Sequence, residues 1–136
     1  MRLMTRLAAA WGRGSTLMRD VARAEGISEK YLGQIVIPLR GAGLVTGQRG
    51  SGGGYVLARA PDAITLREVV EVLEGDLSVV PCVDDPTACA RFEHCGATTV
   101  WQQVAGDIRT RLSAWTLADL AAEWRGKQRV GSDYEI

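Results

Sequence analysis

A glycine-rich segment flanked by two short apolar runs sets the strongest limit on the fold. Leu44–Thr46 and Tyr55–Leu57 lie on either side of Gln48–Gly54, in which four of the seven residues are glycine. Glycine adopts positive φ at no steric cost, so such a segment can reverse the chain tightly between two strands. The pattern predicts a two-stranded β-hairpin with residues 48–54 at its tip.

Three helices are expected before the hairpin, over residues 1–11, 18–25 and 28–42. Each has apolar residues at helical spacing. Gly26 can end the second helix, and Gly43 can end the third in the left-handed conformation. The Ser28 hydroxyl can accept from the free amides of the third helix and cap it. Pro38, inside this third helix, has no amide proton and is expected to bend it.

The third helix has two chemically different faces. One face is predicted to point into the core and carries Leu32, Ile35, Leu39 and Ala42. The opposite face carries Lys30, Gly33, Gln34, Ile37 and Gly41. A polar face of this kind on a helix that follows a helix and a turn is typical of a DNA-reading helix.

Helices followed by a hairpin in this order predict a winged helix-turn-helix fold. The third helix would enter the major groove, and the hairpin would lie along the backbone or the minor groove. Cationic and hydroxyl groups would contact phosphates, and Gln34 suits an adenine edge. The candidate DNA-binding residues are Ser28, Lys30, Tyr31, Gln34, Arg40, Arg49, Gly50 and Ser51.

The glycine-rich segment has simpler interpretations, and the sequence excludes two nucleotide-binding ones. It is not a phosphate-binding P-loop, because no Gly-Lys-Ser/Thr follows. It is not a dinucleotide fingerprint either, because Tyr55 stands where the third glycine belongs. Taken alone, the segment could be only a flexible turn, so the DNA interpretation depends on its combination with the helices before it.

The charge distribution favours DNA as a partner of the N-terminal half. The chain has no net charge, with 16 basic and 16 acidic residues. Residues 1–60 contain nine basic and three acidic residues, a net charge of +6, and residues 61–136 carry the opposite charge of −6. A basic half joined to an acidic half indicates two roles, with nucleic acid as the expected partner of the basic half.

The second half predicts further helices around an irregular segment. Thr65 and Glu68 form a capping-box pattern that opens a helix ending before Gly75. A long helix is expected over residues 97–115, about 28 Å in length, and a last helix over residues 116–124. We divide the chain into a DNA-binding domain (1–60), a cysteine-loop and helical dimerisation region (61–124), and a polar, loose tail (125–136). The fold class is mainly α with one small β-hairpin.

Three cysteines lie in the irregular segment, as Cys82-x6-Cys89-x5-Cys95. Their number does not suit one disulfide, and their neighbours are polar. Clustered thiolates in such a loop favour metal or iron–sulfur ligation. Zinc is a less favoured ligand of these cysteines than an iron–sulfur cluster, because the CxxC pair of a zinc ribbon is absent. Redox-active thiols and structural thiols remain alternatives.

Several motifs together resemble the IscR/NsrR (Rrf-two) family of bacterial transcription regulators. They cover residues 27–32, 38–45, 49–58, 64–75 and 115–120, together with the three cysteines. The resemblance implies a homodimer that binds double-stranded operator DNA through a winged helix-turn-helix and dimerises through the helix 97–115. It also implies an iron–sulfur cluster on Cys82, Cys89 and Cys95 whose state controls DNA affinity.

The chain departs from the family pattern at three places. Thr98 stands where members with a 2Fe–2S cluster have a histidine, and the first acidic residue is Asp20, so the carboxylate expected on the first helix for a 4Fe–4S cluster is missing. Gly33 stands where many members have glutamate, so the preferred operator can differ. The cluster type stays open. Candidate fourth ligands are His94, above the others, and Asp84, Asp85, Glu93 or an outside thiol.

The sequence also argues against other classes of protein. Its apolar runs are too short for a membrane span, and no secretory signal is visible, so we expect a soluble cytoplasmic protein. With one histidine and no nucleophile–base pairing in view, an enzyme is not expected. Two alternatives remain: a cluster-free regulator of the same fold that senses thiols or a protein partner, and a small iron–sulfur or zinc carrier.

Overall fold

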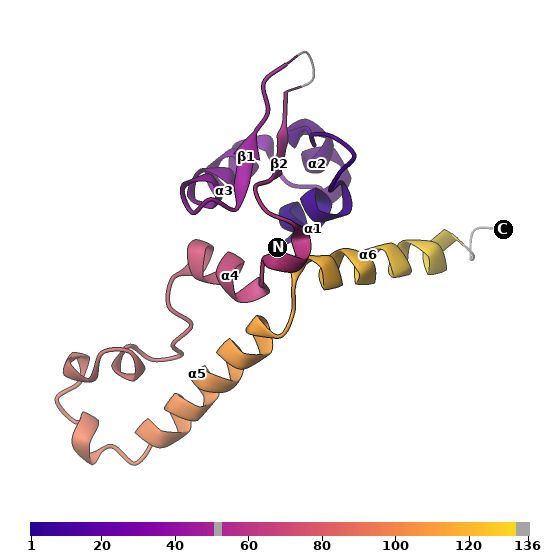
Figure 1. The fold of residues 1–136 in the computed structure, drawn as a ribbon. Coiled ribbons are helices and arrows are strands. Elements are labelled where there is room, and N and C mark those ends of the chain that lie inside the picture. Colours follow the sequence, from indigo (N-terminus) through magenta and orange to yellow (C-terminus); the bar gives the residue numbers. More distant parts are fainter. Residues whose placement is uncertain (51–52, 133–136) are drawn as a thin grey trace.

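The computed structural model describes residues 1–50 and 53–132 as a mainly helical chain with one β-hairpin (Figure 1). The expected fold class is therefore confirmed. A helical upper part carries the hairpin, and an elongated lower part ends in a loop (Figure 1). The helices and strands are α1 (Arg2–Ala9), α2 (Met18–Glu25), α3 (Glu29–Gly41), β1 (Val45–Gly47), β2 (Tyr55–Leu57), α4 (Leu66–Glu74), α5 (Thr98–Ser113) and α6 (Leu117–Ser132).

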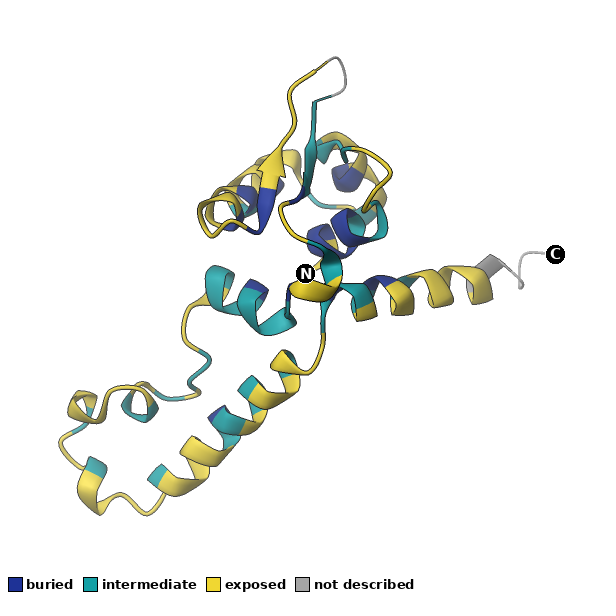
Figure 2. Ribbon diagram, viewed as in Figure 1, coloured by how far each residue is buried: buried dark blue, intermediate teal, exposed yellow. Residues whose placement is uncertain are grey.

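The buried core lies mainly in the upper part, where α1, α2 and α3 pack beneath the hairpin (Figure 2). Leu7, Leu32 and Leu39 are almost completely buried there. The chain makes the turn between α2 and α3 as predicted: Gly26 has a left-handed φ of 63°, and the Ser28 hydroxyl accepts from the Tyr31 amide at 3.1 Å. These signals fix the start of α3 independently of its packing.

The hairpin pairs β1 and β2 in antiparallel register, with Val45 opposite Leu57. A third segment supports it from the other side, because the backbones of Thr16 and Tyr55 exchange two hydrogen bonds of 2.9 Å. Gly54, directly before β2, has a φ of 101°, and a Cβ there would lie 2.6 Å from the Thr16 carbonyl oxygen. Only glycine fits this position without displacing one of the two segments.

The N-terminus of α4 joins the upper and lower parts of the molecule. Thr65 and Glu68 form the predicted capping box, and Arg59 pairs with Glu68 at 2.6 Å. Backbone hydrogen bonds from Leu66 to Trp115 and from Leu117 to Ile64, both 2.9 Å, tie this point to the start of α6. Two backbone segments, residues 64–66 and 115–117, therefore pair at this junction.

Helix α6 packs along α1 and so contacts the upper part directly. The Arg6 guanidinium lies 4.7 Å from the centre of the Trp124 ring and also pairs with Glu25 of α2 at 2.6 Å. A cation held between an aromatic face and a carboxylate connects three helices. Arg6 of α1 thus contacts both α2 and α6.

Two sequence expectations were wrong in detail. Ala42 is exposed, and Val36 takes the inward place on α3, because α3 ends at Gly41 and the buried face follows Leu32, Val36 and Leu39. The last helix was expected to end at Trp124, with a loose tail beyond it, but α6 continues to Ser132. Arg, Lys and Gln in this extension are good helix formers even without apolar periodicity.

Within residues 1–50 and 53–132, no helix is long and apolar enough to cross a membrane.

Candidate DNA-binding surface and cysteine loop

The outward face of α3 presents the side chains that the sequence predicted. Leu32, Val36 and Leu39 anchor the opposite face in the core. Because these three buried side chains fix the rotation of α3 about its axis, the polar face points away from the molecule. The residues exposed on α3 and at its cap include Ser28, Lys30, Tyr31, Gln34 and Arg40.

The hairpin extends beyond α3 and forms the second part of this surface (Figure 1). Arg49 and Gly50 are exposed at its tip, and Gly50 has a φ of 137°. The Ser15 hydroxyl donates to the Gly53 carbonyl at 2.6 Å and holds the base of the tip. Ser51, the remaining predicted contact on the hairpin, lies outside the described residues.

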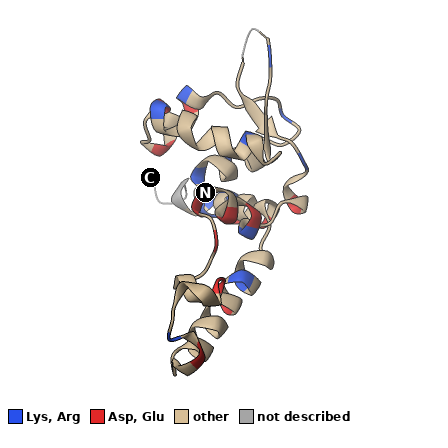
Figure 3. Cartoon of the chain, turned by 90° about the vertical axis from the view of Figure 1, so that its left-hand side faces the viewer, with Lys and Arg blue, Asp and Glu red and all other residues tan. Residues whose placement is uncertain are grey.

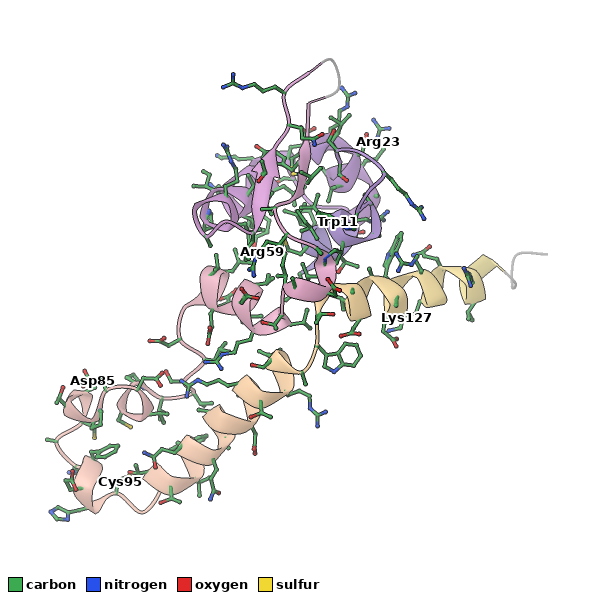
Figure 4. The ribbon with its side chains drawn as sticks, in the orientation of Figure 1. Trp11, Arg23, Arg59, Asp85, Cys95 and Lys127 are labelled. Atoms are coloured by element: carbon green, nitrogen blue, oxygen red, sulfur yellow. The ribbon has the colours of Figure 1, made fainter. Side chains whose placement is uncertain are left out.

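Several Lys and Arg positions lie on the helices and the hairpin of the upper part of the molecule (Figure 3). Arg19 and Arg23 of α2 are exposed, and Arg23 extends outward from its helix (Figure 4). Both residues contribute to the +6 charge of residues 1–60, but neither is among the candidate contacts named from the sequence. Their position on a helix with Val21 and Ala22 inward is the local pattern that predicts their exposure.

The three cysteines lie in a loop at the far end of the molecule from the hairpin, where Figure 4 labels Cys95. This loop consists of three short 3₁₀ helices, Pro81–Val83, Pro86–Ala88 and Phe92–His94. All three thiols are free; Cys82 and Cys89 are half-buried, and Cys95 is exposed. No residue of the loop is buried, so packing within the loop does little to fix its shape.

The described residues do not form a ready-made metal site. Across 1–50 and 53–132, no three Cys, His, Asp or Glu side chains lie close enough together to hold an ion. His94, the preferred candidate for a fourth ligand, is exposed. The donor atoms are of the right kind for iron–sulfur chemistry, but their arrangement is not that of a bound cluster.

Cys95 lies just before the N-terminus of α5. The backbone N–H of Ala97, followed by Thr98, stabilises the negative charge on its sulfur, and these groups hold the pKa of the Cys95 thiol below its usual value. These donors belong to the free N-terminal end of α5. A thiolate is the form that binds metals and reacts with oxidants.

One ion pair connects the cysteine loop to α5. Arg109 of α5 pairs with Asp84 at 2.5 Å, and this contact holds the pKa of the Asp84 carboxyl below its usual value. Asp84 follows Cys82 by two residues, so the ion pair ties the part of the loop next to the first thiol to α5. The contact is partly exposed, so its role is to position the loop rather than to stabilise the fold.

Helix α5 has an apolar side without a partner in the described structure. Val100, Trp101 and Trp115 are exposed along or directly after it. Ile108 and Leu112 line a groove of about 720 Å³, together with Asp107, Thr110, Arg111 and Ala114. Large apolar side chains gathered on one helix are typical of a surface that another chain covers.

Comparison with known proteins places these features in one family. A family model described as "Rrf2: Iron-dependent Transcriptional regulator" matches residues 1–123. The HTH-type transcriptional regulator CymR of Bacillus subtilis is 38% identical over 130 residues, which cover 96% of this chain and 89% of CymR.

Solved structures agree with the sequence match. The structure of CymR, titled "the Global Cysteine Regulator of B. subtilis", superposes with a TM-score of 0.75 and covers 90% of this chain and 89% of its own. The structure of T. potens IscR gives a TM-score of 0.76 at 34% identity and covers 93% of this chain and 83% of its own.

These relatives are winged-helix transcriptional regulators, not enzymes or carriers. They confirm the resemblance found in the sequence motifs. The carrier alternative is not supported by any of them. With the family model matched over residues 1–123, this chain belongs to the Rrf2 family of transcriptional regulators.

Proposed function

We propose that this chain is a cytoplasmic regulator that binds duplex operator DNA as a homodimer and adjusts its affinity through the cysteine loop. The observation that carries the proposal is the outward face of α3, where exposed polar and cationic side chains lie beside a projecting, glycine-tipped hairpin. In this arrangement the fold presents one helix and one wing to the same duplex.

In the proposed complex, α3 lies in the major groove and the hairpin follows the backbone or the minor groove. Lys30, Arg40 and Arg49 contact phosphates, which supplies affinity without sequence preference. Gln34 faces a base edge and prefers adenine, because its amide can donate and accept at once. Ser28, Tyr31, Gly50 and Ser51 complete the proposed contact set.

The proposed homodimer uses the apolar side of α5. Trp101 is 36% exposed although it lies on the same helix as half-buried Ile108 and Leu112. In a two-fold dimer both copies use the same surface patch, so the α5 of a second copy would cover these side chains with its own Trp101, Ile108 and Leu112. Two copies of α3 would then meet successive major grooves about 34 Å apart on an imperfect palindrome.

The proposed sensor is an iron–sulfur cluster, 2Fe–2S or 4Fe–4S, held by Cys82, Cys89 and Cys95. The family description as iron-dependent and the IscR structural neighbour support it. The free thiols have the donor chemistry, although in the described structure they are not gathered around one point. A bound cluster would supply a redox-sensitive charge to a loop that Asp84 and Arg109 tie to α5. His94 is the preferred fourth ligand.

A second candidate is a regulator of the same fold that needs no cluster and senses thiols or a protein partner. The absence of a gathered donor set within the described residues favours it, as does the 38% identity to CymR, titled a cysteine regulator. Cys95 would be its reactive group, because it is exposed and its pKa is lowered.

Anaerobic isolation separates these two sensors. Visible absorption bands, with iron and sulfide in equal amounts, are expected for the first, and their loss is expected in Cys82→Ala, Cys89→Ala and Cys95→Ala. His94→Ala tests the fourth ligand. Colourless protein that contains neither iron nor sulfide, even after anaerobic reconstitution, would contradict the cluster and leave the thiol sensor.

Measuring duplex binding at a series of salt concentrations tests the proposed DNA-binding surface. We expect affinity to fall steeply with salt, and Arg40→Ala to reduce the slope of log affinity against log salt by about one for each lost phosphate contact. Gln34→Ala is the matched variant: it should relax sequence preference and leave the salt slope unchanged. Binding that is insensitive to salt and to both substitutions would contradict the proposed surface.

A further inference from the structure

The most exposed apolar side chain on α3, that of Ile37, is one that the proposed contact set does not use. Ile37 is 68% exposed, more than any other large hydrophobic residue of the described chain. It lies on the face opposite the buried Leu32, Val36 and Leu39 and does not belong to the core or to the residues packed against it. Its side chain is therefore free to contact whatever α3 meets outside the molecule.

The surroundings of Ile37 leave its side chain open to close approach. Residues three and four positions away on a helix are neighbours on its surface, and for Ile37 two of these are Gly33 and Gly41. An added Cβ at either glycine would have no contact within 4 Å beyond its own backbone and chain neighbours. An isoleucine between two glycines projects from the helix without side chains on those sides to cover it.

The position of Ile37 relative to Gln34 fits neighbouring base pairs. The two residues are three apart, about 4.5 Å along the helix axis at 1.5 Å per residue. Successive base pairs are about 3.4 Å apart along the duplex. If Gln34 faces one base edge, Ile37 reaches the next step of the same groove. The only apolar group that base pairs present in the major groove is the thymine C5-methyl.

We propose that Ile37 is a specificity-determining residue that recognises a thymine methyl group in the major groove, beside the base read by Gln34. This inference rests on the proposed function, since it requires α3 to lie in that groove. It assigns an apolar contact to a surface whose other proposed contacts are polar. Lys30 and Arg40, both exposed on α3, would hold the helix on the phosphates while Ile37 selects thymine.

The test replaces single thymines by uracil, which removes only the methyl group. Full-length protein first selects its preferred sites from random duplexes. The selected site is then prepared with deoxyuridine at one thymine position at a time, and affinities are measured at fixed salt. We expect one position in each half-site where the loss of the methyl weakens binding about fourfold, the effect of one buried CH₂-sized group.

Variants of Ile37 then test whether this residue causes the loss of affinity on replacing thymine by uracil. Ile37→Ser should bind thymine and uracil equally at that position, whereas Ile37→Val, which keeps branched methyl groups, should retain part of the difference. Arg40→Ala is the control: it should bind all duplexes more weakly and keep the thymine preference. Unchanged circular dichroism and melting temperature would show that Ile37→Ser is folded, as its exposure leads us to expect.

Two results would overturn the inference and are distinguishable from failure of the proposed function. The first is sequence-selective binding with no uracil-sensitive position. The second is a uracil penalty that Ile37→Ser retains unchanged. In both, the protein remains a DNA reader and only the role of Ile37 is wrong. Protein that selects no sequence at all would contradict the proposed function itself.

Discussion

The N-terminal reader and the cysteine loop are built in opposite ways. In the reader, residues 1–60, buried side chains from α1, α2, α3 and the hairpin pack into one core. In the loop, residues 78–96, no residue is buried, and short 3₁₀ helices follow one another (Figure 2). The reader is held by its own packing, whereas the loop must take much of its order from contacts outside itself.

This difference is consistent with the two proposed roles. A DNA reader must present fixed side chains, and α3 is fixed by Leu32, Val36 and Leu39. A sensor must change shape when its ligand changes, and segments with few buried contacts open at low free-energy cost. The Arg59–Glu68 pair and the contact of α6 with α1 join the reader to the helices that follow it, and the Asp84–Arg109 pair joins the loop to α5.

The largest expected effect on the free energy of unfolding comes from truncating a buried side chain in the core of the reader. Leu32 is fully buried, so Leu32→Ala should lower the free energy of unfolding by about 2–5 kcal/mol through lost burial and an internal cavity. The matched change in the loop is Val79→Ala; Val79 is 47% exposed and should cost no more than about 0.5 kcal/mol. Denaturant unfolding measures both. Equal costs would contradict the contrast between the regions.

The next effect concerns the base of the hairpin. Gly54→Ala should cost on the order of 1–3 kcal/mol and weaken DNA binding, because a positive φ and a 2.6 Å contact with the Thr16 oxygen both oppose a Cβ. The control is Gly33→Ala on α3, where space is open and alanine favours the helix by about 0.5–1 kcal/mol. Thermal unfolding checks both variants. A harmless Gly54→Ala would show that Thr16 does not hold the hairpin.

A smaller effect is expected at the junction. Burial alone would raise the pKa of Glu68, but hydrogen bonds from Arg59 and Thr65 outweigh it, so the pKa is lowered from 4.5. Glu68→Ala should cost about 1 kcal/mol near neutral pH, the usual value of a lost cap. Because the folded pKa is the lower one, the contribution is complete above 4.5 and is lost as pH falls through the lowered value.

Comparing the stability costs of Glu68→Ala and Glu71→Ala separates the contribution of the capping box from that of an ordinary surface ion pair. Glu71→Ala removes an exposed i,i+4 pair with Arg67 on the same helix and should cost about 0.3–0.5 kcal/mol. Urea unfolding at neutral pH and again below the lowered pKa gives the required values. If Glu68→Ala cost no more than Glu71→Ala, or if its cost did not fall with pH, the capping box would not support the junction.

The smallest effect on stability is expected where the loop meets α5. Arg109→Ala removes the partly exposed pair with Asp84, so the melting temperature should change little. Amide hydrogen exchange of residues 81–95 should become faster, because the loop loses its tether. Asp76→Asn is the control, since the described chain provides no ion pair for this exposed carboxylate. Unchanged exchange in Arg109→Ala would exclude the tether.

Local signals made the turn between α2 and α3 and the start of α4 predictable from sequence. Ser28 caps α3, Gly26 takes the left-handed turn, and Thr65 with Glu68 forms the capping box, each through contacts within four residues. The end of α6 was missed because its last turns contain helix-forming but polar residues, which leave no apolar period. Capping and periodicity are properties of short windows, so they can be inferred without the fold.

Long-range contacts and the thiol positions could not be predicted in this way. Arg6 stacks on Trp124, 118 positions along the chain, and no local pattern couples them. The cysteine spacing suggested ligation, but the loop has no buried residues that would bring the three thiols together. Where packing does not fix a segment, spacing indicates its chemistry and leaves its shape undetermined.

The most direct test of the central claim is the affinity for selected operator DNA, measured anaerobically at fixed salt, for iron-loaded protein, iron-stripped protein and Cys89→Ala. Coupling between a sensor and a reader typically changes affinity by about 5–150-fold. We predict that loaded and stripped proteins differ within this range and that Cys89→Ala behaves as stripped protein under both conditions. Equal affinities for all three would contradict the claim that the cysteine loop controls DNA binding.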